Sequence, residues 1–334
     1  MKKIIASGVL SQPWVSFPAI TQSDDGIVWD VPVQPFDIGD ICLSVSSDGT
    51  TAVIPNSRNN VAITTNLVNF SYQLLPELFG IRDITNTNGN WIIIGTQAYL
   101  SGYNVYPENS EVAQIYISAG NTHAWHMVWS HPIAYSRFYQ VRYFDSAPIS
   151  SSVDLQQVII TCGFADTTAD ARYSLDYGQS WSNVDIPTGI KAIHSVALFL
   201  GSEVPLYIWG CHGRFFKSTS LHDISSWTEV LVDSFDTITD IIVDSSDVIV
   251  MCGVNSIYVS YDSTNLRKWK YPGYQFDKIG LLPLIPKNRW IAYARSTLTQ
   301  YSAWTSTDLQ NWHPLNNNVH ATGSTLNIED IFLC

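Results

Sequence analysis

The sequence predicts an all-β protein made of repeated four-stranded antiparallel units, and three observations support this fold class. A short polar phrase closed by an aromatic residue recurs along the 334 residues, an apolar run precedes most copies, and no stretch keeps a helical period. One unit per copy is the simplest organisation of such a chain.

The recurring phrase is Ser-x-Asp followed by Trp, and its clearest copy is Ser174/Asp176/Gly178/Trp181. Three further copies keep the pattern: Ser23/Asp25/Trp29, Ser260/Asp262/Trp269 and Ser306/Asp308/Trp312. Three copies are degenerate: Thr64/Asn66/Phe70, Ser118/Gly120/Trp125 and Ser218/Ser220/Trp227. Successive closing aromatics are 41, 55, 56, 46, 42 and 43 residues apart. This period is typical of one blade of a β-propeller.

The phrase resembles the Asp-box, or bacterial neuraminidase repeat, of sialidase-like β-propellers. The resemblance implies a tight turn in which short polar side chains accept backbone N–H groups and the aromatic residue packs back into the blade. A glycine such as Gly178, where present, supplies a positive φ. Because enzymes and binding proteins share this motif, it predicts architecture and not activity, and we expect the residues of the phrase to be structural.

Two sets of strands are expected in each unit besides the phrase. Apolar runs ending in a small residue are predicted to be second strands buried on both faces, at 91–95, 158–163, 206–210, 248–253 and 290–294. Innermost strands are expected upstream of them, at 81–86, 138–144, 190–199, 237–243 and 277–284.

The two ends of the sequence predict the blade count. Residues 2–8 match a second strand, and residues 326–333 match the innermost strand of a blade that then stops. Together they would make one blade, closing the ring without an exposed sheet edge. We therefore expect a single domain over residues 1–334 that forms a seven-bladed propeller.

Composition agrees with one large domain and restricts its partners. The chain is 46% hydrophobic, with 12 Trp and 17 Tyr, which is enough to fill a sizeable core. Only 14% of its residues are charged and the net charge is −12. Nucleic acids and anionic membranes attract clustered Lys and Arg, so neither is an expected partner.

The N-terminal segment and the cysteines indicate where the protein is made. The apolar patch at 4–10 is short, contains Ser7 and Gly8 and lacks a plausible cleavage site, so we expect no signal peptide. No apolar stretch is long enough to span a membrane. An odd number of cysteines favours free thiols made in a reducing cytoplasm; they are Cys42, Cys162, Cys211, Cys252 and Cys334.

No catalytic set is evident in the sequence. A sialidase needs a Phe-Arg-Ile-Pro-like segment, but the nearest phrase, at 17–20, lacks the arginine. Cys211 has no identifiable base nearby, and no metal or cofactor site is predicted. A glycoside hydrolase acting on a polymer needs only two carboxylates across a cleft, and this alternative stays open.

Binding surfaces are expected on the propeller's upper face, where second strands connect to third strands. The connection at 95–112 is long and carries Tyr99, Tyr103 and Tyr106, residues suited to recognition of proteins or sugars. It could also pack on its own neighbours or on another subunit. Further residues expected on this face are Trp14, His131, Tyr135, Arg137, His212, Arg214, Arg295 and Tyr301.

We therefore predict a non-enzymatic propeller that binds or assembles. The setting we favour is the virion surface of a bacterial virus, as a tail, spike or decoration protein that contacts host glycan, a receptor or a neighbouring virion protein. The alternatives are the glycoside hydrolase and an intracellular assembly scaffold. The latter would resemble the Asp-box factor that helps to build photosystem II, although that factor is exported and has basic patches not evident in this sequence.

Overall fold

The computed structural model describes residues 4–12, 15–23, 30, 33–36, 44–56, 59–75, 80–98, 111–119, 124–133, 135–150, 155–234, 236–270, 275–282, 289–295, 303–315 and 325–333. These ranges contain strands and one 3₁₀ turn, η2 (Ile224–Ser226). None of their helical residues forms a helix of the length and apolarity needed to cross a membrane. The all-β prediction is confirmed for the described residues.

The described strands form six four-stranded antiparallel sheets and one three-stranded sheet. The first four sheets are β3–β6 (Ser46–Ser47, Ala52–Pro55, Asn60–Thr64, Ser71–Leu74), β7–β10 (Gly80–Thr87, Asn90–Ala98, Glu111–Ala119, Trp125–Ser130), β11–β14 (Ser136–Pro148, Leu155–Ala165, Thr168–Ser174, Ser182–Asn183) and β15–β18 (Ser195–Phe199, Leu206–Gly210, Arg214–Ser218, Thr228–Leu231). The others are β19–β22 (Ile238–Val243, Ile249–Gly253, Ser256–Ser260, Leu266–Lys270), β23–β26 (Gln275–Leu282, Arg289–Arg295, Ala303–Ser306, His313–Leu315) and β2–β1–β27 (Val15–Ser23, Ile4–Gln12, Thr325–Leu333).

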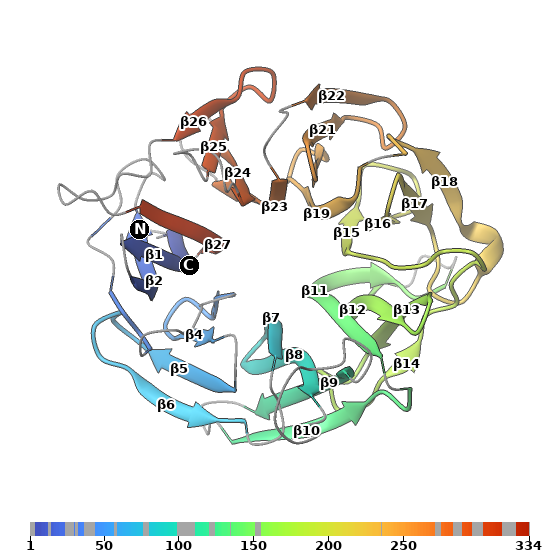
Figure 1. The fold of residues 1–334 in the computed structure, drawn as a ribbon. Coiled ribbons are helices and arrows are strands. Elements are labelled where there is room, and N and C mark those ends of the chain that lie inside the picture. The colour runs from blue at the N-terminus through green and yellow to red at the C-terminus, as the bar shows by residue number, and fades with distance from the viewer. Residues whose placement is uncertain are drawn as a thin grey trace.

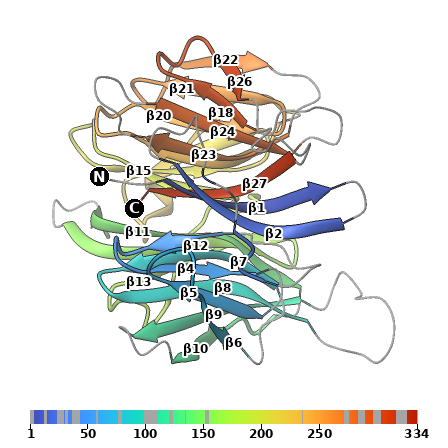
Figure 2. The ribbon, with the colours of Figure 1, turned by 90° about the vertical axis from the view of Figure 1, so that its left-hand side faces the viewer.

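The sheets are arranged around a central axis, and the first strands β7, β11, β15, β19 and β23 lie closest to it within their sheets (Figure 1). Strand β27 pairs with β1 in antiparallel register, from Ile4 opposite Leu333 to Ser11 opposite Thr325. It also contacts β23 and β24 on one side and β3 on the other. Figure 2 shows β1, β2 and β27 between the β23 sheet and the β4 sheet.

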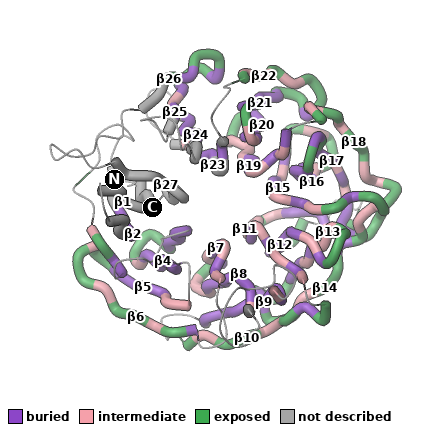
Figure 3. The backbone as a smooth tube through the Cα atoms, viewed as in Figure 1, coloured by how far each residue is buried: buried purple, intermediate pink, exposed green. Residues whose placement is uncertain are grey.

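Second strands are buried on both faces, as their continuous apolarity predicted. Ile93 on β8 packs in one cluster with Val61 of the preceding sheet, whereas Ile92 packs in another with Phe138 of the following sheet. Each fully buried aliphatic side chain contributes about 1.5–3 kcal/mol. Outer strands such as β6 and β18 are largely exposed (Figure 3), so most of the packing lies between neighbouring sheets.

One innermost strand is shorter than expected. The prediction of a strand over 190–199 is correct only from Ser195, where β15 begins. Upstream of it, the carbonyl of Ile190 accepts the N–H of Ala169, which belongs to the neighbouring sheet. Because this hydrogen bond leaves the ladder, residues 190–194 form a connection that bridges two sheets.

The repeated phrase forms a repeated turn, shown by its last copy. The N–H of Leu309 donates to Ser306 Oγ at 2.9 Å. The N–H groups of Gln310 and Asn311 donate to Asp308 Oδ1 at 2.9 and 2.8 Å. The two polar side chains therefore satisfy the amides that the tight turn leaves without ladder partners.

In the turns that begin at Thr64, Ser174 and Ser260, as in the one at Ser306, the hydroxyl donates to the carboxylate or amide oxygen two residues later. The N–H groups that the pair accepts vary: in the Ser174 turn they include those of Gly178 and Ser180. In each turn the residue after the Asp or Asn is left-handed, with φ between 56° and 59°; these residues are Leu67, Tyr177, Ser263 and Leu309. The expectation that glycine supplies the positive φ is therefore incomplete, because Gly178 (φ 92°) is only a second such residue in its turn. Side-chain hydrogen bonds of about 1 kcal/mol each offset the 1–2 kcal/mol cost of a left-handed non-glycine residue.

The copy that contains Asn66 is degenerate in sequence, yet its turn is complete in structure. Asn66 Oδ1 accepts the N–H groups of Val68 and Asn69, both at 2.9 Å, and Thr64 Oγ1 accepts the N–H of Leu67 at 2.9 Å. The side chain of Asn66 is exposed, so it acts through these hydrogen bonds and not through burial in the sheet. An amide oxygen therefore replaces the carboxylate of Asp without a change in the turn, since the turn requires an acceptor and not a charge.

The copy at Ser218 is built differently. Ser218 Oγ accepts the indole N–H of Trp209, and Asp223 instead receives the N–H of Ser225 to cap η2. Trp227 then stacks on Trp209 with ring centroids 5.1 Å apart. Asp25, Trp29 and Gly120 lie outside the described residues. The other closing aromatics, Phe70, Trp125, Trp181, Trp269 and Trp312, belong to or pack against core clusters.

Candidate functional site

The four-stranded sheets present two different faces. Their innermost strands β7, β11, β15 and β19 begin on one face, where second strands also end, and we name this the upper face. The Ser-x-Asp turns follow the third strands and lie on the opposite face, which we name the box face. Any ligand site on the upper face is therefore built from connections outside the repeated turns.

A pocket of about 550 Å³ opens on the upper face between the β15–β18 sheet and the connection that leads to it from β14. Residues 187–192, which belong to this connection, form one wall. The other wall consists of Cys211, His212, Arg214, Phe216 and Glu229. The pocket therefore combines aliphatic and aromatic lining with a few charged groups, the usual composition of a binding site.

A tight turn positions two of the pocket residues. Gly213, between β16 and β17, has φ 71°, and its N–H donates to the carbonyl of Asp236. A Cβ at this position would lie 3.3 Å from the backbone of Ser234, so glycine suits both the conformation and the space. The turn places the exposed side chains of His212 and Arg214 at the pocket.

Arg214 and Glu229 form the charged pair of this pocket. Arg214 Nη1 lies 2.6 Å from Glu229 Oε1, and the two side chains are 45% and 41% exposed. His212 Nδ1 lies 2.7 Å from the hydroxyl of Thr237. Lys191, on the opposite wall, is exposed.

Cys211 is a structural residue of the pocket floor. It is buried, and its Sγ donates to the carbonyl of Trp209 at 3.9 Å. Burial raises the pKa of its thiol to about 12, with a smaller opposing effect of Arg214. The thiol is therefore protonated at neutral pH and unsuited to nucleophilic attack.

A row of aromatic rings leads from the β11 sheet towards the pocket. Tyr135 packs edge-on against Phe164 with centroids 5.2 Å apart, and Tyr139 contacts the same Phe164 at 5.7 Å. Tyr139 stacks on His194 at 4.6 Å. Burial, followed by the nearby His212, lowers the pKa of His194 to about 4, so its imidazole is neutral at pH 7.

The residues predicted for the upper face do not form one site. His212 and Arg214 line the pocket, whereas Tyr135 belongs to the aromatic row. Arg137 forms an ion pair with Glu111, with Nε and Nη2 at 2.8 and 2.5 Å from Oε2. Arg295 is the last residue of β24, and its side chain is not among those that the structure describes. Trp14, Tyr99, Tyr103, Tyr106 and Tyr301 lie outside the described residues.

His131 lies inside the protein. It is 6% exposed, its Nδ1 accepts the N–H of Ile133, and its Nε2 lies 3.4 Å from Asp170 Oδ2 of the next sheet. Burial lowers its pKa, and the nearby carboxylate of Asp170 partly opposes this. These contacts leave His131 little surface for a ligand.

Several pocket and row residues were not singled out from the sequence, notably Lys191, Glu229, Tyr139 and His194. One signal was available for the wall at 187–192. Pro187, Thr188 and Gly189 form a turn signal at the junction of two units, where the chain returns to the upper face.

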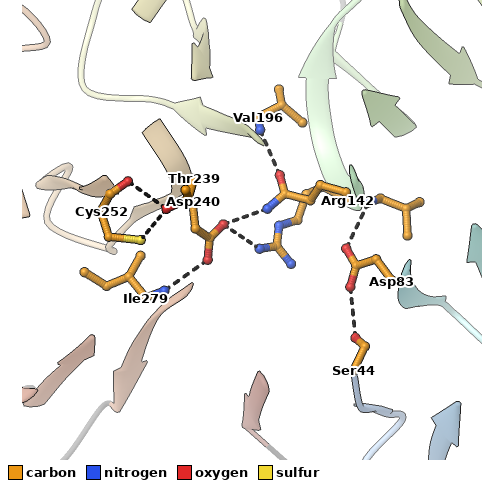
Figure 4. A network of polar contacts seen from close by, with 10 residues as sticks. Ser44, Asp83, Arg142, Val196, Thr239, Asp240, Cys252 and Ile279 are labelled. Carbon is orange, nitrogen blue, oxygen red and sulfur yellow. Dashed lines mark hydrogen bonds and ion pairs between the residues drawn. The ribbon is translucent and has the colours of Figure 1, made fainter. Parts of the chain in front are cut away.

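A second polar cluster lies on the axis and has a structural role (Figure 4). Asp83 Oδ2 accepts the N–H of Val141 at 3.0 Å, which links β7 to β11. Gln140 Oε1 accepts the N–H of Val196 at 2.8 Å, which links β11 to β15. The innermost strand of one sheet thus receives a backbone N–H from that of the next.

Asp240 extends this network to the far side of the axis. Its Oδ2 accepts the N–H of Ile279 on β23 at 3.1 Å, and its Oδ1 accepts Gln140 Nε2 and Arg142 Nη2 at 2.6 and 3.1 Å. A shift of register in the first strand precedes both carboxylates, between Ile81 and Asp83 and between Ile238 and Asp240. Such bulges redirect side chains, here towards the neighbouring innermost strands.

Other site chemistry is limited within the described part of the chain. Those residues contain no group of three or more His, Cys, Asp or Glu arranged to hold a metal ion. On the box face, hydrogen bonds from Asn265 and Thr264 lower the pKa of Asp262 to about 2. A carboxyl of this kind is ionised at neutral pH and cannot serve as a general acid.

Comparisons with known proteins identify the fold. No protein-family model matches the chain, and neither does any curated protein. A solved structure of YCF48 bound to D1 peptide is 14% identical with a TM-score of 0.60, covering 87% of this chain and 90% of that one. For YCF48 from Cyanidioschyzon merolae the identity is 14%, the TM-score 0.60 and the coverage 92% and 97%. Virginiamycin B lyase from Staphylococcus aureus is 13% identical with a TM-score of 0.58, covering 81% and 83%. At such identities the likeness concerns the fold alone, and on this basis the chain has a β-propeller fold.

Proposed function

We propose that this chain is a non-enzymatic binding propeller that holds a polypeptide segment of a partner protein in the upper-face pocket. The observation that carries the proposal is the pocket itself, an open cavity of about 550 Å³ between the β15–β18 sheet and the connection at 187–192. Its floor and walls include Ile190, Ala192 and Phe216, and its mouth includes Lys191 and Arg214. A short segment with aliphatic and charged side chains matches this lining.

The same lining favours polypeptide over glycan. Sugar rings commonly stack on an exposed aromatic plate, whereas Phe216, in the pocket wall, is only 7% exposed. The aliphatic groups beside it suit a side chain better than a hydroxylated ring. YCF48, one of the propellers of similar fold, was solved with a D1 peptide, so this architecture is compatible with peptide binding.

The proposal includes the finer architecture predicted from the sequence. We propose a seven-bladed Asp-box propeller over residues 1–334, closed by β27 in the blade that also contains β1 and β2. The pairing of β27 with β1 and the bond from the hydroxyl to the carboxylate or amide oxygen, which four turns have in common, support it. A place on the virion surface of a bacterial virus, with a neighbouring virion protein as partner, stays a prediction, as does the alternative of a cytoplasmic protein.

The geometry favours binding over glycoside hydrolysis. A hydrolase requires two carboxylates that face a common substrate. Among the described residues that line the pocket, Glu229 is the single carboxylate, and both it and Glu111 on the same face lie in an ion pair with an arginine. Their oxygens are thus directed to guanidinium groups.

The test is affinity selection from a library of random heptapeptides displayed on particles. Thr188→Trp places a large ring at the pocket mouth from an exposed position, and Gln179→Trp adds the same ring at an exposed position of the box face. We expect the wild-type protein to enrich peptides that, once synthesised, bind Thr188→Trp at least tenfold more weakly and Gln179→Trp with unchanged affinity. Calorimetric titration measures both.

Two results would overturn the proposal. One is the absence of enrichment by the folded wild-type protein. The other is equal affinity of the enriched peptides for the wild type and Thr188→Trp. Thermal melting of each variant shows that the comparison is made between folded proteins.

A further inference from the structure

We propose that the upper-face pocket recognises a carboxylate of its ligand, and that Glu229 occupies the place of this carboxylate in the free protein. The inference rests on the proposed function and names the chemistry of the ligand, a polypeptide segment in which an Asp, a Glu or a free C-terminus adjoins an aliphatic residue. Arg214 is the group that would exchange Glu229 for the ligand.

Charge at the pocket is opposite to that of the whole chain. The protein has a net charge of −12, yet Lys191 and Arg214 line the pocket together with a single carboxylate, Glu229. When Glu229 is engaged with Arg214, Lys191 remains as an exposed cation on the opposite wall. An incoming anion is attracted to this local charge and is repelled by much of the remaining surface.

The pair of Arg214 and Glu229 is suited to exchange. Its contact joins one guanidinium nitrogen to one carboxylate oxygen, whereas a guanidinium can hold a carboxylate by two parallel hydrogen bonds. Both side chains are more than 40% exposed, so water screens their attraction and the pair contributes little to stability. A ligand carboxylate with two-fold contact therefore competes well for Arg214.

The pair of Arg137 and Glu111 is an internal reference on the same face. Two nitrogens of Arg137 contact Glu111 Oε2, and the side chains are only 28% and 23% exposed. Neither residue lines the pocket. The pair of Arg137 and Glu111 contains the same two residue types as the pair of Arg214 and Glu229 but lies outside the pocket. A change in Glu111 is therefore the matched control for a change in Glu229.

Below the charged mouth, the pocket offers apolar contacts. Ile190 and Phe216 are buried, and Ala192 is half-buried. A ligand whose carboxylate reaches Arg214 would place a neighbouring side chain against these groups. An aliphatic side chain gains by leaving water there, which is why an acidic residue next to an aliphatic residue defines the ligand class.

The test uses the same random heptapeptide library, selected separately on the wild type, Glu229→Gln, Arg214→Gln and Glu111→Gln. We expect the wild type to enrich Asp, Glu or a free C-terminal carboxylate, and Glu229→Gln to bind these peptides three- to tenfold more tightly. We expect Arg214→Gln to lose the preference for acidic peptides, and Glu111→Gln to behave as the wild type.

The outcomes separate this inference from the proposed function. Enrichment of peptides without any acidic preference, with Thr188→Trp still blocking them, would overturn the carboxylate inference and leave peptide binding intact. Unchanged or weaker binding by Glu229→Gln would overturn the role of Glu229. If the wild type enriches no peptide, the proposed function fails and the inference fails with it. Synthesised Glu-to-Gln peptide pairs measure the contribution of the charge directly.

Discussion

The box face and the upper face belong to the same sheets, yet only one of them repeats. On the box face, four turns share a hydrogen bond from the hydroxyl to the carboxylate or amide oxygen two residues later, and a left-handed residue at the same position. On the upper face, the connection after the second strand has residues 166–167 in one sheet, 211–213 in the next and 99–110 in another. Repetition thus marks the turns that join third strands to fourth strands, and the pocket lies where repetition stops.

We expect the largest loss of stability when β27, a strand that runs between both faces, is deleted. Deleting residues 325–334 removes β27, which pairs with β1 and contacts β23, β24 and β3. We expect the loss to exceed the 5–15 kcal/mol that stabilises most domains, so that the truncated chain does not unfold cooperatively. Calorimetry measures this. A truncated protein that melts cooperatively near the intact protein's temperature would contradict closure by β27.

We expect the next largest loss of stability when the axial network of Asp83, Gln140 and Asp240 is broken. Asp240→Ala removes the acceptor of hydrogen bonds from Ile279, Gln140 and Arg142, in a position only 1% exposed. We expect a loss of about 3 kcal/mol in the free energy of unfolding, because buried donors are left unpaired. Urea denaturation measures the change, and Asp185→Ala, at an exposed position, is the control. Equal stability of the two variants would show that the network is not a structural link.

Acid should weaken the upper face through His194. Its pKa is about 4 in the folded protein and about 6.5 in an unfolded chain, so the unfolded state binds the proton first as pH falls. Stability is therefore lost between pH 6.5 and 4, by about 2 kcal/mol at pH 5. His194→Phe keeps a ring against Tyr139 and should lose less stability than the wild type over this interval. Denaturation curves at pH 7, 6, 5 and 4 test this, and parallel losses in both proteins would refute it.

The smallest expected change in stability, that of Asp176→Ala, distinguishes the roles of the two faces most clearly. Asp176→Ala removes the acceptor for the N–H and hydroxyl of Ser180 on the box face. We expect about 1 kcal/mol of destabilisation and unchanged affinity for selected peptides. Thr188→Trp should show the reverse, with unchanged melting and lost affinity. A change in affinity without a change in melting for Asp176→Ala would assign the box turns a role in binding.

The parts that the sequence predicts well are those whose causes are local. Second strands such as β16 (Leu206–Gly210) coincide with the apolar run, because burial on both faces requires continuous apolarity. The turns were predictable because a hydroxyl and a carboxylate two residues apart bond nearby amides, and Asn66 shows that an amide oxygen serves equally well. No distant group is needed for either.

The pocket depends on contacts between sheets, which no local pattern reveals. Residues 190–193 are mostly apolar, like the start of a strand, but the hydrogen bond from Ala169 to Ile190 draws them out of the ladder and into the pocket wall. His131 was expected on the surface, and its contact with Asp170 of the next sheet places it inside. Arg214 and Glu229 meet because β17 and β18 pair, a neighbourhood that their sequence separation does not specify.

The axial links have a direction that bears on synthesis. Asp83 accepts the backbone N–H of Val141, Gln140 accepts that of Val196 and Asp240 accepts that of Ile279. Each of these three acceptors is translated before the strand that donates to it. A growing chain emerges from the ribosome N-terminal end first. The sheets of β7, β11 and β19 therefore each carry an acceptor for a strand made later, and Asp240 in addition joins that later strand to Gln140 and Arg142, which are made before it.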